Sequence, residues 1–358
     1  MIISTSTVHT KILNIQALRG IAVLFVIALH LLENENKYAH GYTILPHFFN
    51  IGTSGVDLFF VISGFVMVAI TRDWFRQPGA IPKFLYHRVT RIYPMYWFYS
   101  LLMLAIYLVQ RKTGSDTRIV DLTASFFLLP QSQLPLLVVG WTLVHELYFY
   151  LVFSLFLMFP LRWMPPLLLI WGATSIIGCL FQIDSPTFQL ITNPLTLEFI
   201  GGSLIALIYF SGKSSPEIAK KSSLIFLIIG FGWWVISYSV CIKLGLPPES
   251  SGWIRIAAYG FPAACSVYSL VTIEKYSNRR MPIWLILIGN ASFSIYLSHL
   301  LVIAAIGRIW EKFGFVGSWT NSVVLVGMLL STIVVGIVSF QLIELPLLKF
   351  TRRFEKLL

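Results

Sequence analysis

The stretch ILNIQALRGIAVLFVIALHLLE, residues 12–33, is the first of ten apolar runs that decide the fold of this chain. A helix needs roughly 20 mostly apolar residues to cross the hydrocarbon core of a bilayer, and most of the runs reach or approach that length. No small-residue cleavage site ends the first run, so we expect it to remain in the protein as the first helix. The later runs lie near residues 55–71, 92–110, 141–160, 165–182, 194–210, 223–243, 253–273, 283–307 and 321–345.

The composition also indicates a membrane protein. Of the 358 residues, 57% are hydrophobic and 11% are charged, whereas soluble domains carry about a quarter charged residues. We therefore predict an all-α, polytopic transmembrane bundle of about ten helices. It should form a single membrane-embedded domain over residues 1–358, without a soluble extracytoplasmic domain. Residues 119–138 contain Pro130 and Pro135 and are expected to lie at the interface rather than to span the membrane.

The net charge of +11 has a topological explanation. Lysine and arginine lie in short clusters between the apolar runs, and most of them fall on one side of an alternating ten-span arrangement. Cytoplasmic loops carry an excess of Lys and Arg, so both termini are predicted to be cytoplasmic. No nucleic-acid partner is needed to explain the charge. The basic residues on the predicted cytoplasmic side are Lys11, Arg19, Arg72, Arg76, Lys83, Arg88, Arg91, Arg162, Lys213, Lys220, Lys221, Lys275, Arg279, Arg280, Lys349, Arg352, Arg353 and Lys356.

Two ionisable residues share the first apolar run. Arg19 and His30 are eleven residues apart, which is within about 20° of three full helical turns and a rise of roughly 16 Å. Both side chains should therefore lie on one face, with Arg19 near the cytoplasmic surface and His30 in the outer half. Ionisable groups inside spans are costly, which makes them functional candidates. A structural imidazole bonded to a neighbouring carbonyl is the alternative for His30.

Other ionisable residues are predicted at a similar depth to His30. Asp57 opens the second run, His145 and Glu146 open the fourth, and His299 lies within the ninth. A carboxylate near an imidazole fixes its tautomer and raises its basicity, as proton abstraction from an alcohol requires. The sequence leaves open which carboxylate faces which histidine.

A pair of arginines stands at the cytoplasmic start of the third run. Arg88 and Arg91 are three residues apart and should be neighbours on one helix face. Ordinary positive-inside anchoring would explain them. The alternative is an anion site, because two guanidiniums can hold a phosphate bidentately. The sequence contains no phosphate-binding loop, nucleophile elbow or zinc-binding spacing.

Several motifs, in order along the chain, resemble the acyltransferase-3 family of integral-membrane O-acyltransferases. The likeness covers residues 12 to about 350 and looks most like the exopolysaccharide-modifying acetyltransferase branch. It is carried by Arg19 and His30, Gly55-Val-Asp-Leu-Phe-Phe-Val-Ile-Ser-Gly-Phe65, Arg88-x-x-Arg91, Gly140-Trp-Thr-Leu-Val-His-Glu146, Ser292-Phe-Ser-Ile-Tyr-Leu-Ser-His299 and Ile343-Glu344-Leu-Pro346.

This resemblance implies transfer of an acyl group, usually acetyl from acetyl-CoA, to a hydroxyl of an exopolysaccharide or other surface glycan, either polymeric or lipid-linked. His30 would be the catalytic base. Acyl-CoA would be a donor substrate, and no tightly bound cofactor or metal is expected. The implied catalytic residues are His30, Asp57 and Glu146, and the implied CoA-binding residues are Arg19, Arg88 and Arg91.

Two other functions remain open at this point. A transporter or flippase of lipid-linked saccharides would also bury charges near the midplane of the membrane. A non-catalytic assembly partner of a polysaccharide synthase would tolerate substitution of Arg88 and His30. Consumption of acetyl-CoA that depends on added glycan distinguishes the enzyme from both.

Overall fold

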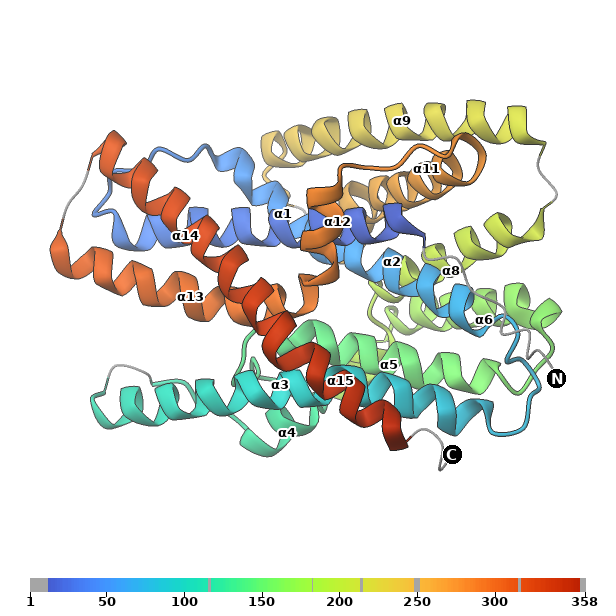
Figure 1. The fold of residues 1–358 in the computed structure, drawn as a ribbon, viewed down its shortest axis with the longest axis horizontal. Coiled ribbons are helices and arrows are strands. Elements are labelled where there is room, and N and C mark those ends of the chain that lie inside the picture. The colour runs from blue at the N-terminus through green and yellow to red at the C-terminus, as the bar shows by residue number, and fades with distance from the viewer. Residues whose placement is uncertain are drawn as a thin grey trace, which may run out of the picture.

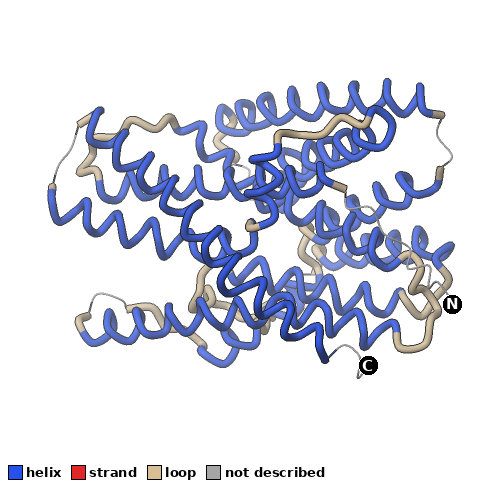
Figure 2. Tube along the Cα trace, in the orientation of Figure 1, coloured by secondary structure: helices blue, strands red, loops and turns tan. Residues whose placement is uncertain are grey.

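The computed structural model describes residues 12–114, 117–181, 183–212, 215–247, 252–314 and 317–354. Over these residues the chain forms helices and loops and no strand, which confirms the predicted all-α fold (Figures 1 and 2). Short 3-10 or π-helical turns are η1 (His47–Thr53), η2 (Leu161–Trp163), η4 (Ile256–Gly260) and η5 (Phe340–Glu344). The α-helices are α1 (Leu13–Tyr38), α2 (Ser54–Thr71), α3 (Ala80–Lys112), α4 (Leu122–Phe127), α5 (Gly140–Phe156), α6 (Met164–Gly178), α7 (Pro186–Ile191), α8 (Thr196–Ser211), α9 (Pro216–Lys243), α10 (Gly252–Arg255), α11 (Phe261–Ser277), α12 (Ile283–Asn290), α13 (Ser292–Phe313), α14 (Ser318–Ser339) and α15 (Leu345–Arg352).

The described part of the chain contains eight helical segments long and apolar enough to cross a membrane. They coincide with eight of the ten predicted runs and confirm a multi-pass membrane protein. The other two runs form α5 and α6, apolar helices of 17 and 15 residues. The run expected at residues 283–307 is not one helix, because the chain breaks after Asn290 into α12 and α13.

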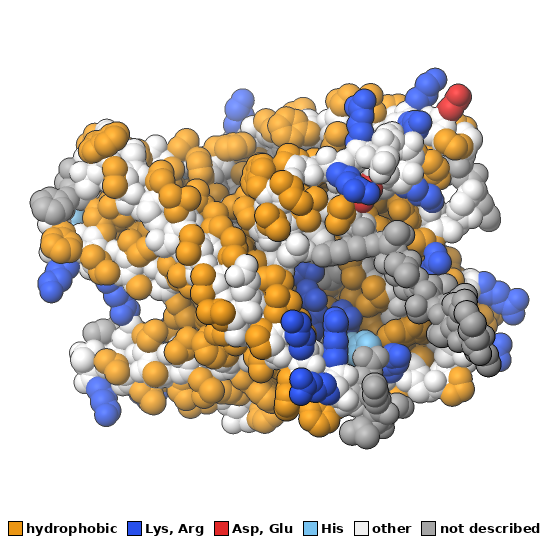
Figure 3. Space-filling model, viewed as in Figure 1, with side chains coloured by type: hydrophobic (Ala, Val, Ile, Leu, Met, Phe, Trp, Pro, Cys, Tyr) orange, Lys and Arg blue, Asp and Glu red, His pale blue; other side chains and the backbone are white. Residues whose placement is uncertain are grey.

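The surface of the bundle is largely apolar, as contact with lipid requires. On α9, the side chains of Ile228, Phe231 and Ile236 are 60–69% exposed. Figure 3 shows hydrophobic side chains over most of one face, with Lys and Arg more numerous toward the end where α1 begins and α15 ends. We call this the terminal end. Lys11, Lys213 and Lys356 of the predicted cytoplasmic set lie outside the described residues.

The helices differ in how far they extend along the bundle. In Figure 1, α1, α3, α13 and α14 reach the end opposite the terminal end, whereas α5, α6 and α8 occupy the half near the terminal end. The short helix α4 lies halfway along α3, where Tyr93, Tyr96 and Trp97 donate hydrogen bonds of 2.6–2.9 Å to its carbonyl groups. The connection from α4 to α5 therefore places irregular backbone at mid-depth, and residues 119–138 form no spanning helix, as predicted.

The start of α1 is fixed by a carboxylate from another helix. The first backbone N–H groups of an α-helix have no partner within the helix. The Glu274 side chain of α11 accepts hydrogen bonds from the backbone N–H groups of Leu13 and Asn14, at 2.9 and 2.7 Å. A negative charge at this position also complements the helix dipole. These hydrogen bonds fix the position of the first turn of α1 relative to α11.

Two pairs of helices cross at glycines, which allow close backbone contact. A Cβ atom at Gly289 of α12 would lie 1.7 Å from the carbonyl oxygen of Gln16 on α1. A Cβ atom at Gly202 of α8 would lie 1.9 Å from the carbonyl oxygen of Val61 on α2. The first crossing directs the chain after α12 so that α13 begins beside α1. The second holds α2 against α8.

Candidate active site

A cavity of about 250 Å³ lies among α1, α2, α3, α5 and the start of α13. Arg19, Arg88 and Arg91 all line it, together with one carboxylate, Glu146. We call it the arginine cavity. The three predicted CoA-binding residues are thus brought together, although they come from two helices far apart in sequence. The lining carries a net positive charge.

Local packing orients two of the arginines. The Nε atom of Arg19 donates a hydrogen bond of 3.2 Å to the hydroxyl of Ser292, the first residue of α13. The guanidinium of Arg88 lies over the aromatic rings of Phe84 and Tyr150, at 5.7 and 5.6 Å. Arg88 Nε is buried and has no hydrogen-bond partner among the described residues. A buried, unpaired guanidinium N–H suits an anionic ligand.

Glu146 is held by two hydroxyl groups on the wall of the same cavity. Tyr150, one turn further along α5, donates to Glu146 Oε1, and Ser63 of α2 donates to the same oxygen at 3.1 Å. The carboxylate is therefore fixed on the side of α5 that faces the arginines. Its charge partly offsets theirs.

His30 lies beyond this cavity and does not line it. The Nδ1 atom of His30 is 2.6 Å from a carboxylate oxygen of Glu33, and the imidazole is 20% exposed. This contact favours the tautomer with a proton on Nδ1, which leaves Nε2 to accept one. On α13, the fully buried ring of His299 lies 5.0 Å from the ring of His30. Arg19 and His30 thus both face α13, as their spacing predicted.

A tyrosine lies between the arginine cavity and the two histidines. Tyr296 lines the cavity, and its ring centroid is 5.6 Å from that of His299. Its hydroxyl is 2.9 Å from the hydroxyl of Thr142 on α5. His299 Nδ1 is bonded to the carbonyl oxygen of Tyr296 at 2.6 Å, and His299 Nε2 has no partner among the described residues. Side chains in contact therefore connect the cavity to His30.

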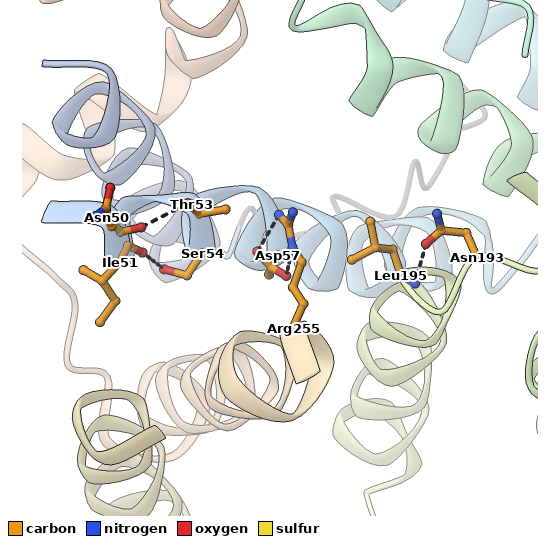
Figure 4. Close-up of polar contacts among 8 residues, drawn as sticks. All are labelled: Asn50, Ile51, Thr53, Ser54, Asp57, Asn193, Leu195 and Arg255. Carbon is orange, nitrogen blue, oxygen red and sulfur yellow. Dashed lines mark hydrogen bonds and ion pairs between the residues drawn. The ribbon is translucent and has the colours of Figure 1, made fainter. Parts of the chain in front are cut away.

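Asp57 is engaged in an ion pair with Arg255 (Figure 4). Its two carboxylate oxygens accept hydrogen bonds of 2.8 and 2.9 Å from Nε and Nη2 of Arg255, and Asp57 is fully buried. It does not line the arginine cavity. A buried pair with two parallel bonds fixes geometry strongly. The structure therefore assigns Asp57 to an ion pair with Arg255 and not to the lining that contains Glu146.

His145 faces another side of α5 from Glu146. Its ring stacks on Phe60, with centroids 6.2 Å apart, and its Nδ1 atom is 3.0 Å from the carbonyl oxygen of Trp141. The ionisable residues that were expected in one zone are therefore divided among the arginine cavity, the His30–His299 pair, the Asp57 ion pair and the neighbourhood of His145.

Sequence reasoning missed two partners in these groups. Glu33 follows His30 by three residues, a spacing that brings side chains together on a helix. Arg255 is the single charged residue in the run 253–273, which marks it as a buried functional or structural cation. The described residues contain no group of three or more His, Cys, Asp or Glu side chains able to hold a metal ion.

The chain is similar in sequence to several known proteins over most of its length. The chain is 30% identical to the exopolysaccharide production protein ExoZ of Rhizobium meliloti, over 85% of this chain and 92% of that protein. It is 26% identical to the acyltransferase MdmB of Streptomyces mycarofaciens, over 95% of this chain and 92% of that protein. It is 25% identical to the peptidoglycan O-acetyltransferase OatA of Listeria monocytogenes, over 94% of this chain but only 56% of that protein.

No solved structure matches the chain. The profile of the acyltransferase-3 family, described as an acyltransferase domain, matches residues 12–340. This range includes every residue of the arginine cavity and the His30–His299 pair. The chain therefore belongs to the acyltransferase-3 family, as its motifs predicted.

Proposed function

We propose that this membrane O-acyltransferase transfers an acyl group, most simply acetyl, from cytoplasmic acyl-CoA to a hydroxyl of an exopolysaccharide or other surface glycan. The observation that carries the proposal is the arginine cavity, in which Arg19, Arg88 and Arg91 surround a single carboxylate. CoA carries several phosphate groups, and guanidiniums bind phosphate bidentately. The relatives named for exopolysaccharide production and O-acetylation support the acceptor class.

The position of the cavity supports a cytoplasmic donor. α1 begins and α15 ends at the terminal end (Figure 1), and Lys and Arg are concentrated there. By the positive-inside rule this end faces the cytoplasm. We assign the protein to the inner membrane of a bacterium, because the relatives named above are bacterial. The cavity, at about 250 Å³, suits the acyl-pantetheine arm and part of the phosphates. The nucleotide of CoA would then lie at the cytoplasmic mouth.

The chemistry assigned to His30 is general-base catalysis. The Nε2 atom takes the proton of the sugar hydroxyl as its oxygen attacks the thioester carbonyl carbon. The carbon–sulfur bond breaks, and the proton passes from the imidazolium to the departing CoA thiolate. Glu33, 2.6 Å from Nδ1, orients the ring and stabilises the imidazolium. Movement of Tyr296 would open the path from the arginine cavity to His30.

The proposal is tested with purified protein in lipid nanodiscs. The protein is given acetyl-CoA with and without de-O-acetylated exopolysaccharide from its host, and release of CoA thiol is measured beside formation of acetyl ester. An acyltransferase releases thiol only when glycan is present, in equal amount to the ester. A flippase in proteoliposomes moves lipid-linked saccharide and leaves the thioester intact, which would contradict the proposal. An assembly partner retains full glycan acetylation in cells that carry His30→Ala or Arg88→Ala.

A further inference from the structure

A second cavity, of about 230 Å³, lies on another side of α5, between the α4–α5 connection and α7. Its lining contains the amide side chains of Gln131, Gln133, Gln189 and Asn193, together with Trp141. We call it the amide cavity. Lys, Arg, Asp and Glu are missing from this lining, which consists of described residues. The mechanism proposed for His30 does not involve the residues of the amide cavity.

Buried polar atoms without protein partners lie around this cavity. Both amide atoms of Gln131 are buried and have no hydrogen-bond partner among the described residues. The same is true of His145 Nε2, on the α5 wall. Unsatisfied buried polar groups are uncommon in native structures, and each is costly unless a ligand or water pairs with it. Three such atoms around one cavity can pair with a ligand that both donates and accepts hydrogen bonds.

The surrounding backbone indicates that the cavity opens to water. Irregular backbone at membrane depth is tolerated where it is buried in protein or lines an aqueous space. The wall from Leu129 to Pro135 is non-helical and follows α4, which lies halfway along α3. Ser132 and Gln133 on this wall are exposed. The α4–α5 connection joins α5 at the end of that helix that points away from the terminal end (Figure 1), so the cavity lies toward that side of the bundle.

The chemistry of the lining selects a neutral, hydroxyl-rich ligand. Amide groups offer a donor and an acceptor together, which matches sugar hydroxyls. The indole ring of Trp141 offers an apolar face and one N–H. In contrast with the arginine cavity, no fixed charge in the lining would favour a phosphate or a carboxylate. Asn193 already uses its carbonyl oxygen to accept the Leu195 N–H at 3.0 Å (Figure 4), which leaves its amino group to donate.

We infer that the amide cavity binds a neutral sugar unit of the glycan acceptor, from the extracytoplasmic side, next to the unit that is acylated. This inference rests on the proposed function, because it assigns the acceptor of that same reaction. α5 then separates the two substrates: Thr142, Glu146 and Tyr150 face the donor, while Trp141 and His145 face the acceptor. The sugar bound here fixes the register of the glycan relative to the unit that is acylated.

The test measures sugar binding without catalysis. The probe is the oligosaccharide fraction prepared by partial hydrolysis and de-O-acetylation of the host's exopolysaccharide, tritiated at the reducing end. Equilibrium binding to purified protein in nanodiscs is measured in the absence of CoA. Gln131→Leu and Gln189→Leu should each weaken binding about tenfold, because each leaves sugar hydroxyls unpaired. Gln77→Leu, an exposed amide in the loop after α2, is the matched control and should bind like wild type.

A second measurement separates acceptor from donor effects. In acetyl transfer, the same two variants should raise the half-saturating oligosaccharide concentration about tenfold and leave that of acetyl-CoA unchanged. If Gln131→Leu fails to fold in a thermal melt, Gln189→Leu, on α7, carries the test alone. Wild-type protein that does not bind the probe, or variants that bind as wild type does, would overturn the inference. Probe binding without any acetyl transfer would instead refute the proposed function and leave the sugar site standing.

Discussion

The two cavities that flank α5 are similar in size, at about 250 and 230 Å³, and differ in charge. The arginine cavity holds three guanidiniums and one carboxylate, and the amide cavity holds side-chain amides and an indole without a fixed charge. One helix supplies a wall to both. Under the function proposed above, this difference in charge matches two chemically unlike substrates, a polyanion in the arginine cavity and a neutral polyol in the amide cavity.

The residues between the cavities have a different role from the residues that line them. Asp57 and Arg255 form a buried ion pair near the start of α2, and neither belongs to the lining of either cavity. The Arg255 guanidinium also lies 5.7 Å from the ring of Trp141, in the wall of the amide cavity. We interpret this pair as the support that fixes α2 against the wall between the two sites.

The largest expected effect is on the rate of acyl transfer, and it comes from replacing the proposed base, His30. His30→Ala should lower acetyl transfer by about a hundred- to ten-thousand-fold, the usual contribution of a general base. Binding of acetyl-CoA and of oligosaccharide should both persist, since His30 lines neither cavity. Rates and ligand binding are measured on the same nanodisc preparation. His47→Ala, at an exposed position, is the control, and a His30→Ala enzyme with half of the wild-type rate would end the base assignment.

Asp57 should affect stability more than chemistry. Asp57→Ala removes the carboxylate that accepts the hydrogen bonds from Nε and Nη2 of Arg255, and removal of one member of a buried pair costs about 3–5 kcal/mol. We expect a clear drop in the thermal melting temperature in detergent. The double variant Asp57→Leu/Arg255→Met should recover part of the loss, because it removes both charges of the ion pair together. The recovery is incomplete because the buried Glu198 loses the neighbouring Arg255 cation. A single variant that melts like wild type but is inactive would show that Asp57 acts in catalysis.

The close contact of α2 with α8 supports a wall of the arginine cavity. Gly202→Ala would place a methyl group 1.9 Å from the Val61 carbonyl oxygen, whereas a Cβ at the neighbouring Gly201 would meet nothing within 4 Å. Overpacking of this kind costs about 1–3 kcal/mol. We expect Gly202→Ala to lower the melting temperature and Gly201→Ala to leave it unchanged. Equal melting temperatures for the two variants would show that α2 and α8 are not in close contact at Gly202.

The smallest expected effect comes from Arg88→Lys, which tests whether phosphate is bound by two parallel hydrogen bonds or by positive charge alone. Arg88→Lys keeps the positive charge but loses the planar fork of N–H donors. The half-saturating acetyl-CoA concentration should rise about tenfold, the equivalent of about 1.4 kcal/mol, with the oligosaccharide dependence unchanged. Arg162→Lys, an exposed arginine in η2, serves as the control. A shift in the oligosaccharide dependence instead would contradict the division between the two cavities.

Features that lie on one helix were predictable from sequence. Arg19 and His30 share a face because helical geometry fixes the angle between positions eleven residues apart. Arg88 and Arg91 line one cavity for the same reason. Apolar runs predicted, in order, the eight membrane-crossing segments of the described residues, and the two other runs correspond to the shorter helices α5 and α6. Even so, the break after Asn290 was missed, because hydrophobicity alone does not reveal a turn between two apolar helices.

Features that depend on which helices are neighbours were not predictable. Asp57 was expected among the catalytic groups, and its partner Arg255 follows it by 198 residues. His145 and Glu146 are adjacent in sequence, yet they line different cavities because consecutive helical residues point about 100° apart. The amide cavity escaped notice because its residues come from loops and a short helix without a periodic pattern.

The most direct test of the account is the structure of this protein with CoA bound in lipid nanodiscs, determined by electron cryomicroscopy. The measured quantity is the distance from the CoA phosphates to the guanidiniums of Arg88 and Arg91. We predict hydrogen-bonding distances, with the pantetheine arm passing Arg19 toward Tyr296. CoA bound instead in the basic hollow lined by Lys220, Lys275 and Arg279, or in the amide cavity, would contradict the account.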